Sequence, residues 1–321
     1  MEPGTLNEKI SEAERRIRPH VRETPVERSV RFGRMTGCDV SFKLENLQHT
    51  GSFKARGATN KLLSLAPERR EKGVVAGSSG NHGLAVAWAT SKLGVPCTVF
   101  VPEGASPAKV AAMREYGPEV RFHGTDAAVA EARARGRAEE DRLAYVSPYN
   151  DPEVVAGQGT IATELVKQSD GIDAVFVPVG GGGLISGVAG YLKGALGQGV
   201  HVYGCQPENS AVMYESVRAG RVLDLPSGPT LSDGTAGGLE PGTITFEPCR
   251  MYVDDWVLVS ETEIREAMNL FMDAHHVMIE GAAGVSIAAF LKRRDELRGA
   301  NVAVVVSGAN IALGTLKDIV H

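Results

Sequence analysis

Short apolar segments rich in Val, Ile and Phe alternate along this chain with longer segments that have the apolar spacing of helices. The apolar segments are Val40–Phe42, Val74–Ala76, Thr98–Val101, Val120–Phe122, Ala174–Val179, Val202–Tyr203 and Val302–Val306. Helical spacing and good helix formers occur between most of them, as in His82–Leu93, Pro107–Tyr116, Asp126–Arg142, Gly157–Gln168, Glu261–His276 and Ala282–Arg294. Strands that alternate with helices of this length form βαβ units and parallel sheets. The pattern therefore predicts an α/β fold.

The length of 321 residues, at about 150 residues per domain, predicts two domains. We expect a small inserted domain at residues 50–149, with four short strands, and a large domain at residues 1–49 and 150–321. Right-handed crossovers would place the functional loops at the carboxyl ends of the strands. The charged segment Glu131–Asp141 mixes both signs at helical spacing, so we expect it to form a solvated helix face.

Composition and charge exclude several classes of protein. Apolar residues make up 43% of the chain and charged residues 23%, which is typical of a globular protein. The net charge of −5 leaves no basic footprint, so we expect no nucleic acid as a partner. A polar N-terminus and the glycine-rich character of the uncharged stretch 174–192 argue against a signal peptide and a membrane span. Widely spaced cysteines fit buried thiols in a reducing compartment, so we expect a soluble cytoplasmic protein; they are Cys38, Cys97, Cys205 and Cys249.

Lys54 lies in the segment NLQHTGSFKARG, residues 46–57, between Phe53 and small residues that lead into the helix-like stretch Ala58–Leu65. Most lysines in polar loops are solvated, but this amine would lie at a helix start in a partly apolar setting. Desolvation disfavours the ammonium form and lowers the pKa of a lysine. Because nucleophilic and Schiff-base chemistry both need a neutral amine, Lys54 is a candidate for that role.

Two further segments have the composition of anion-binding turns. GSSGNHG, residues 77–83, follows an apolar strand and opens a helix, where free N–H groups and the helix dipole favour a carboxylate or phosphate. An ordinary capped turn is the alternative for that segment. Four consecutive glycines, Gly180–Gly183, lie between an apolar strand and an apolar helix, where a flexible linker makes little sense and a phosphate-binding loop fits. The loop is neither a Walker motif nor a dinucleotide fingerprint.

Ser307 ends the most apolar strand of the chain, in the segment VAVVVSGANIALG. Its hydroxyl could cap the next helix or face a heteroatom of a ligand. A lysine, an anion-binding turn, a phosphate-binding loop and a serine at a strand end are together the groups that hold pyridoxal phosphate.

The motifs SFKxRG, SSGNHG, AGQGT, GGGGL, SDGTAGG and SGAN occur here in the order found in one family. Over about residues 15–318 the chain resembles the fold-type II (tryptophan synthase β-like) pyridoxal phosphate enzymes, in the threonine/serine dehydratase and serine racemase branch. The resemblance implies two parallel-sheet domains with helices on both faces and the cofactor in the cleft between them. It also suggests a homodimer that acts on a small amino acid.

The resemblance assigns roles to residues. Lys54 would be the Schiff-base lysine with Phe53 packed beside the ring, and Ser307 would pair with the pyridine nitrogen. The phosphate would be bound by the glycine loop and the next amide, that is by Gly180, Gly181, Gly182, Gly183 and Leu184. Asn81 would hydrogen-bond the phenolic oxygen, and the substrate carboxylate would be held in the same turn by Ser78, Ser79, Asn81 and His82.

The implied reaction is loss of water from a β-hydroxy amino acid, L-threonine or L-serine, to give a 2-oxo acid and ammonia. Lys54 would remove the α-proton. A serine at the pyridine nitrogen cannot hold a pyridinium charge as a carboxylate would, and the weaker electron sink suits β-elimination.

Three features depart from close relatives in this family. Gln206 and Val212 stand where a divalent-metal site of racemases and some dehydratases has carboxylates, so we expect no metal site, although Glu208 lies nearby. Tyr149 stands where relatives have Phe or Asn, which leaves the choice of substrate open. The sequence ends soon after SGAN, and in this respect the chain resembles the short catabolic dehydratases, which have no regulatory domain.

Several alternatives stay open at this point. A serine racemase would use Ser79 as the proton donor on the second face of the α-carbon. A dehydratase for 3-hydroxyaspartate or for a hydroxyectoine-derived substrate would share the same motifs, whereas a β-replacement synthase fits them less well. A pyridoxal phosphate-binding regulatory protein would not need Lys54, and a nucleotide-binding α/β protein would share only the glycine loop and the sheet.

Overall fold

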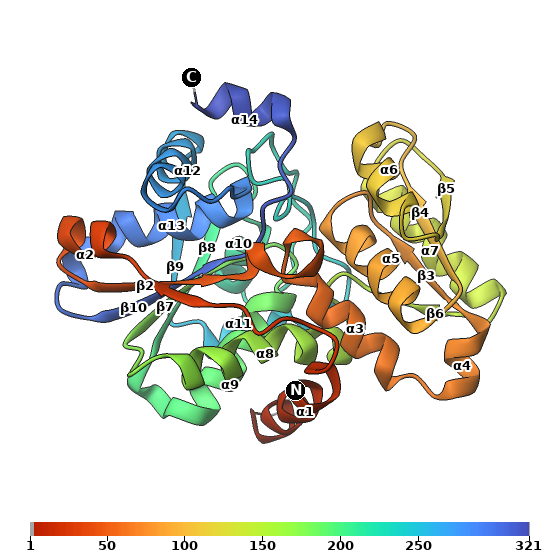
Figure 1. Cartoon of the computed structure of the whole chain (residues 1–321), viewed down its shortest axis with the longest axis horizontal. Coiled ribbons are helices and arrows are strands. Elements are labelled where there is room, and N and C mark those ends of the chain that lie inside the picture. Colours follow the sequence, from red (N-terminus) through yellow and green to blue (C-terminus); the bar gives the residue numbers. More distant parts are fainter. Residues whose placement is uncertain (1–2, 321) are drawn as a thin grey trace.

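The computed structural model describes residues 3–320 and contains two sheets flanked by helices (Figure 1). The larger sheet has the strand order β1-β2-β10-β7-β8-β9, and the smaller has the order β5-β4-β3-β6. The strands of the larger sheet are β1 (Val26–Arg28), β2 (Asp39–Leu44), β7 (Ala174–Pro178), β8 (His201–Pro207), β9 (Asp255–Val259) and β10 (Asn301–Val306). Those of the smaller sheet are β3 (Val74–Gly77), β4 (Cys97–Val101), β5 (Glu119–Phe122) and β6 (Ala144–Tyr145).

Fourteen α-helices surround the sheets within residues 3–320. The first seven are α1 (Pro3–Ile17), α2 (Val30–Thr36), α3 (Lys54–Ser64), α4 (Pro67–Lys72), α5 (Asn81–Leu93), α6 (Pro107–Arg114) and α7 (Ala127–Glu140). The others are α8 (Pro152–Gln168), α9 (Gly183–Leu196), α10 (Val212–Ala219), α11 (Phe246–Tyr252), α12 (Glu261–His275), α13 (Gly281–Arg293) and α14 (Leu313–Val320). The predicted α/β fold is therefore confirmed.

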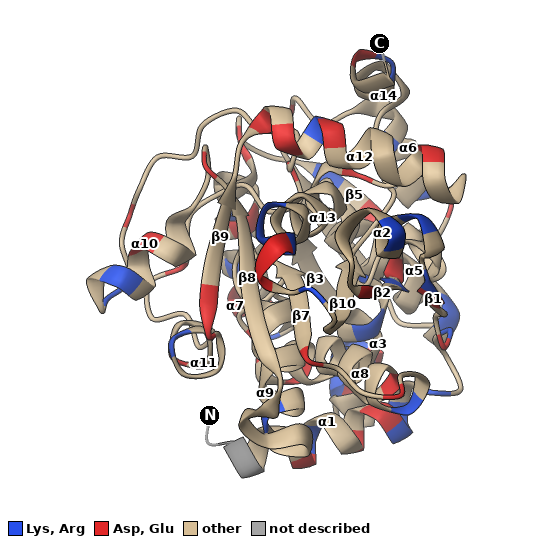
Figure 2. Cartoon of the chain, turned by 90° about the vertical axis from the view of Figure 1, so that its left-hand side faces the viewer, with Lys and Arg blue, Asp and Glu red and all other residues tan. Residues whose placement is uncertain are grey.

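The larger sheet is buried on both faces, and its central strands show why. Along β10, Val302 and Val304 pack into the core with α12 and α13, while Ala303 and Val305 face α1, α8 and α9. A strand covered on both sides must be apolar at consecutive positions, which explains the continuous valine run. Figure 2 shows this contrast, with charged residues on the surrounding helices and the ribbon of β7 free of them.

The smaller sheet is also covered on both faces. Val75 and Phe100 pack against α7, and Val99 and Val101 pack against α5 and α6. Its four strands lie between residues 74 and 145, inside the segment expected to form an inserted domain. The domain boundaries at 49/50 and 149/150 stay a prediction.

The structure differs from the sequence-based expectations in several details. Strands β1 and β9 were not predicted, and β6 is the fourth strand expected in the small domain, which the sequence did not locate. Strand β1 pairs with β2 antiparallel, so the larger sheet is not wholly parallel. Helix α8 begins at Pro152 rather than at Gly157, because the side chain of Asp151 caps the N–H groups of Glu153 and Val154. All four cysteines are free; three are buried as expected, but Cys97, at the start of β4, is partly exposed. No helix within residues 3–320 is long and apolar enough to cross a membrane.

Candidate active site

Lys54 is the first residue of α3, the helix that packs against both α5 and α8 and so lies between the two sheets (Figure 1). The loop before it is joined to the end of β10 by backbone hydrogen bonds. Phe53 N–H donates to Ser307 O at 3.1 Å, and Ala309 N–H donates to Gly51 O at 2.9 Å. The chain segments that carry the predicted lysine and the predicted strand-end serine therefore lie side by side.

The amine of Lys54 is held in a partly apolar setting. Nζ donates to the carbonyl oxygen of Pro148 at 2.8 Å and lies 5.1 Å from the centre of the Phe53 ring. Burial lowers the pKa of Lys54 to about 8, and the negative charges of Glu131 and Glu280 oppose that shift without cancelling it. A substantial fraction of the amine is therefore neutral near pH 8, as nucleophilic chemistry requires.

The turn that precedes α5 forms the second part of the site. Ser78, Ser79 and Gly80 are partly exposed, and α5 begins at Asn81. A Cβ on Gly83 would overlap the carbonyl of Ser78, so only glycine allows the turn to fold back on the helix start. The first N–H groups of a helix have no intrahelical partner, which leaves them available to an anion.

The imidazole of His82 is hydrogen-bonded within the protein. It is 3% exposed, and its Nε2 lies 2.8 Å from the carbonyl oxygen of Val146. Because a carbonyl only accepts, Nε2 carries the proton and Nδ1 is left as a bare acceptor. Burial lowers the pKa of His82 to about 3, so the ring stays neutral at physiological pH. The imidazole therefore cannot donate to a substrate carboxylate, whereas the backbone N–H of His82 can.

Asn81 is held by two residues from other parts of the chain. Its Nδ2 donates to both carboxylate oxygens of Glu280, at 2.8 and 3.0 Å, and its Oδ1 accepts from Nδ2 of Asn310 at 2.6 Å. Glu280 immediately precedes α13, and Asn310 belongs to the segment that follows β10. Burial raises the pKa of Glu280 to about 7.

The glycine loop lies between β7 and α9 and leaves no space for side chains. A Cβ on Gly180 would lie 3.0 Å from the backbone of Thr235, and a Cβ on Gly181 would overlap the ring of Tyr149. Gly182 has φ of +82°, which favours glycine, and α9 begins at Gly183. The backbone N–H groups of Gly183 and Leu184 thus belong to the first turn of a helix, where an anion is stabilised.

Ser307 is 2% exposed, and its Oγ has no hydrogen-bond partner among residues 3–320. A buried hydroxyl without a partner is costly, and the cost is removed if a ligand supplies one.

The comparisons with known proteins agree with this geometry. Residues 17–308 match the family model described as pyridoxal-phosphate dependent enzyme. The chain belongs to this family.

The chain is 41% identical over 314 residues to L-threonine ammonia-lyase of Thermotoga maritima, covering 98% of the chain and 78% of the relative. Among solved structures it is similar to the processed form of threonine deaminase isoform 2 from Solanum lycopersicum, with TM-score 0.94, 31% identity, and coverage of 99% and 93%. It is also similar to maize serine racemase, with TM-score 0.91, 34% identity, and coverage of 97% and 95%. The likeness extends over both sheets.

The residues present in this family member fit pyridoxal phosphate. The unpartnered hydroxyl of Ser307 suits the pyridine nitrogen, and the loop Gly180–Gly183 offers the closely packed backbone that a phosphate requires. Lys54 lies beside the Ser307 loop with a lowered pKa, as an amine that attaches to the cofactor's aldehyde should.

Two carboxylates near Lys54 were missed by the sequence reasoning. Glu280 follows an unremarkable helical stretch, and only its distant contacts with Asn81 and Asn310 reveal it. Glu131 was expected on a solvated helix face, which is wrong for this residue: its backbone packs 2.6 Å from the position of a Cβ on Gly77, and burial raises its pKa to about 7. The abundance of small residues in α7 was the available signal for that close approach.

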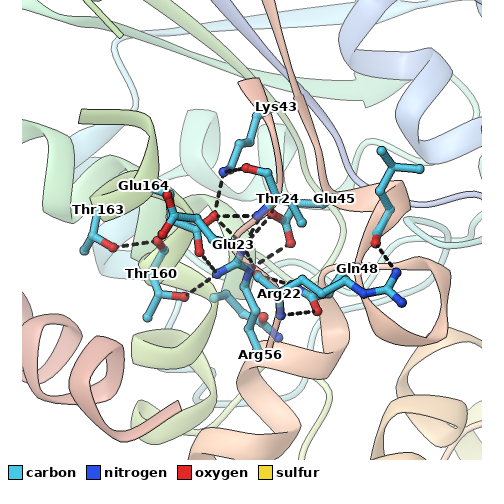
Figure 3. Close-up of polar contacts among 12 residues, drawn as sticks. Arg22, Glu23, Thr24, Lys43, Glu45, Gln48, Arg56, Thr160, Thr163 and Glu164 are labelled. Atoms are coloured by element: carbon cyan, nitrogen blue, oxygen red, sulfur yellow. Dashed lines mark hydrogen bonds and ion pairs between the residues drawn. The ribbon is translucent and has the colours of Figure 1, made fainter. Parts of the chain in front are cut away.

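Helix α3 also carries Arg56, whose side chain enters a buried ion network formed by Lys43, Glu45, Arg56 and Glu164 (Figure 3). These four side chains are fully buried. The guanidinium binds Glu45 at 2.8 Å through both Nε and Nη2, and it binds Glu164 at 2.6 and 2.7 Å through Nη1 and Nη2. The network fixes α3 against β2 and α8 and so fixes the start of the helix where Lys54 stands.

Gln206, at the expected position of a metal ligand, is engaged by the backbone. Its Nε2 donates to Val179 O at 3.1 Å, and its Oε1 accepts from Tyr214 N–H at 2.8 Å. Within residues 3–320 no group of three His, Cys, Asp or Glu side chains is arranged to hold a metal ion.

Proposed function

We propose that this chain is a threonine/serine dehydratase: it converts L-threonine or L-serine into a 2-oxo acid and ammonia. The observation that carries the proposal is that Lys54, whose amine has a lowered pKa, follows a loop whose backbone is hydrogen-bonded to the strand end that carries Ser307, whose hydroxyl has no partner within residues 3–320. The similarity over nearly the whole chain to an L-threonine ammonia-lyase supports the same reaction.

Binding of the substrate carboxylate falls to the turn before α5. The hydroxyls of Ser78 and Ser79 and the free N–H groups at the helix start provide donors for it, and Asn81 borders the same space. The glycine loop with Leu184 holds the cofactor phosphate, and Phe53 packs beside Lys54. These assignments place the α-carbon of the amino acid between α3 and the α5 turn.

The amine of Lys54 would hold the cofactor, and the same amine would take the α-proton from the substrate. When bound, the cofactor withdraws electrons from the substrate's α-carbon and so weakens its C–H bond. The lowered pKa of Lys54 keeps the amine able to accept a proton near neutral pH. The neutral hydroxyl of Ser307 stabilises positive charge at the pyridine nitrogen less than a carboxylate would, which favours early departure of the β-hydroxyl as water.

Residues 50–149 form the small domain in this proposal, and the site lies between it and the large domain. We further propose that the enzyme works as a homodimer in the cytoplasm, by analogy with the family. Sedimentation of the purified protein measures the first of these properties directly.

The test is a panel of β-hydroxy amino acids supplied to the purified, cofactor-loaded protein, with measurement of 2-oxo acid, ammonia and the enantiomers of the remaining substrate. L-threonine and L-serine should give 2-oxo acid and ammonia in equal amounts. Formation of D-serine without 2-oxo acid would instead identify a racemase that uses Ser79. Preference for 3-hydroxyaspartate or a hydroxyectoine-derived substrate would revise the substrate, and cofactor binding without turnover would indicate a regulatory protein.

A further inference from the structure

Three side chains from three separate elements meet at the start of α5. Asn81 is the first residue of that helix, Glu280 precedes α13, and Asn310 follows β10. The amide of Asn81 donates to Glu280 through Nδ2 and accepts from Asn310 through Oδ1. Glu280 and Asn310 therefore both act on the side-chain amide of Asn81.

The hydrogen bonds determine which way the Asn81 amide faces. Asn310 Nδ2 donates to the backbone oxygen of Thr50 at 2.7 Å, and a carbonyl oxygen can only accept. That contact fixes the amide of Asn310, whose NH₂ group then requires Oδ1 of Asn81 as its second acceptor. If the Asn81 amide turned over, its NH₂ would face the NH₂ of Asn310 and its oxygen would face the carboxylate of Glu280. The contact between the two NH₂ groups would be repulsive, and so would the contact between the oxygen and the ionised form of Glu280, so the observed orientation is favoured.

The favoured orientation leaves one N–H of Asn81 unused. Nδ2 carries two hydrogens, and a single one serves both oxygens of Glu280 in a three-centre bond. The other hydrogen is free to donate to a ligand. A phenolic oxygen that carries negative charge needs a donor at this place, whereas the reversed amide would present a lone pair to it.

We propose that Glu280 and Asn310 are positioning residues that orient the amide of Asn81 so that its second N–H donates to the cofactor's phenolic oxygen. This inference rests on the proposed role of Asn81 in binding the cofactor. Glu280 is 3% exposed, and it also accepts the backbone N–H of Asn310 at 3.1 Å. The charged groups that act on it are Lys54, Lys109 and Asp233.

Gly308 supports this interpretation from a different side. A Cβ at that position would overlap Oε1 of Glu280, so the backbone after Ser307 leaves the space that the carboxylate occupies. Backbone N–H of Glu280 in turn donates to the oxygen of Gly308 at 3.0 Å. The segment that carries Ser307 and Asn310 is therefore built around this carboxylate.

A double-mutant cycle tests the inference. Pyridoxal phosphate is titrated into the apo forms of wild type, Asn81→Ala, Glu280→Gln and the double variant, with the dissociation constant and the visible absorption band as readouts. Asn81→Ala and Glu280→Gln should each weaken binding about tenfold and shift the band. In the Asn81→Ala background Glu280→Gln should have less than about a twofold further effect, because its action passes through the amide.

Asn310→Ala provides a second cycle, because it removes the other partner of the Asn81 amide without altering a buried charge. We expect it to weaken binding of pyridoxal phosphate about three- to tenfold in the wild-type background and to have no further effect in the Asn81→Ala background. The matched control is Glu261→Gln, because Glu261 also accepts from an asparagine, Asn209, at 3.5 Å and lies at the start of α12. It should leave the band unchanged.

The outcomes separate the two levels of the proposal. If Asn81→Ala weakens binding but Glu280→Gln and Asn310→Ala act equally strongly in both backgrounds, the positioning role is wrong and the role of Asn81 stands. If Asn81→Ala itself has no effect on affinity or on the band, the role of Asn81 is rejected and the positioning role with it. Lower melting temperatures of the apo variants with unchanged affinity would likewise reject it, because that pattern marks a purely structural role.

Discussion

Lys54 and Arg56 are two residues apart on α3, yet they enter opposite kinds of buried environment. Arg56 belongs to the buried ion network, where two carboxylates surround its guanidinium. Around Lys54 the polar groups are only partly satisfied: Ser307 Oγ and His82 Nδ1 have no hydrogen-bond partner within residues 3–320. A helix turns by about 100° per residue, so side chains two apart point to nearly opposite sides. One helix thus joins a structural cluster to a functional one.

The pKa values of one carboxylate in each cluster, Glu164 and Glu280, shift in opposite senses. In the network, the nearby positive charges of Arg56 and Lys43 outweigh burial and hold the pKa of Glu164 at about 2. Its ionised form therefore stabilises the fold above pH 4.5, and this contribution is lost as the pH falls toward 2. Near Lys54, burial dominates instead and raises the pKa of Glu280 to about 7, so ionising Glu280 costs stability as the pH rises. The side chains of the ion network are paired with one another, whereas some buried polar groups at the site have no hydrogen-bond partner within residues 3–320.

The largest effect should come from removing the amine at the site. Lys54→Ala should reduce turnover of L-threonine by at least about 10³-fold, because both cofactor attachment and proton removal depend on this group. The apo protein should melt no lower than wild type, since a buried amine with a lowered pKa contributes little to stability. Turnover and differential scanning calorimetry check both parts. Turnover at the wild-type rate would show that Lys54 does not do the chemistry.

Arg56 should show the reverse pattern. Arg56→Met should lower the free energy of unfolding by about 3–5 kcal/mol, because it leaves Glu45 and Glu164 as buried charges without their main partner. Arg250→Met is a matched control, since Arg250 pairs with Glu247 on the surface and should change stability by less than about 1 kcal/mol. Urea unfolding of the two variants decides the point. Equal, small losses for both would mean that the network is not structural.

The glycine loop offers a sterically defined test of the site. Gly181→Ala should weaken binding of pyridoxal phosphate about tenfold or more, because the new Cβ would overlap the ring of Tyr149 and displace the loop. Adding Tyr149→Ala should recover part of that affinity. Gly199→Ala is the control, because a Cβ there meets nothing within 4 Å. Unchanged affinity in Gly181→Ala would place the phosphate elsewhere.

The sequence alone predicted the fold and the local motifs of the site, but it did not predict every element. The alternation of apolar segments and helices, with glycines at the turns, was sufficient for the fold, because central strands buried on both faces must be apolar throughout. Strand β1, Val-Glu-Arg, could not be found in this way, since it is a three-residue edge strand with no buried side chain. Local motifs indicated Lys54, the glycine loop and Ser307 because each depends on its immediate neighbours.

Partners distant in sequence stayed hidden. Glu280 accepts a hydrogen bond from Asn81, which is 199 residues away, and Arg56 donates to Glu164, which is 108 residues away. A single sequence contains no record of such pairs. The contact between His82 Nε2 and Val146 O was hidden for the same reason, because only the fold brings these two groups together.

The lowered pKa of Lys54 predicts how the rate of cofactor uptake depends on pH. With a pKa of about 8, roughly a tenth of the amine is neutral at pH 7 and about half at pH 8. The rate at which the apo protein takes up pyridoxal phosphate covalently should therefore rise about fivefold between these values and level off above pH 9. Stopped-flow absorbance at constant ionic strength measures it. A midpoint near pH 10.5, the ordinary value for lysine, would show that burial does not activate the amine.

The smallest effect should come from removing divalent cations. Gln206 and Val212 occupy the positions where metal-dependent relatives would need carboxylates, and both are buried. The amide of Gln206 is already engaged at both ends by backbone groups, so it cannot turn to a cation without breaking these bonds. Glu208 lies near Lys292, at 3.8 Å, and a hard ion needs several oxygen ligands at once.

Treatment of the holoenzyme with EDTA should consequently change the rate of 2-oxo acid formation by less than about twofold, with or without added Mg²⁺ or Ca²⁺. Glu208→Gln should behave in the same way, because its carboxylate is half exposed and is paired with a surface lysine, Lys292. A large loss in EDTA that Mg²⁺ or Ca²⁺ restores, and that Glu208→Gln abolishes, would place a cation beside Glu208. The amide of Gln206 would then have to break its hydrogen bonds to the backbone before a cation could bind. In that case a fully hydrogen-bonded side chain would belong to a functional site, contrary to the contrast drawn between the ion network and the site of Lys54.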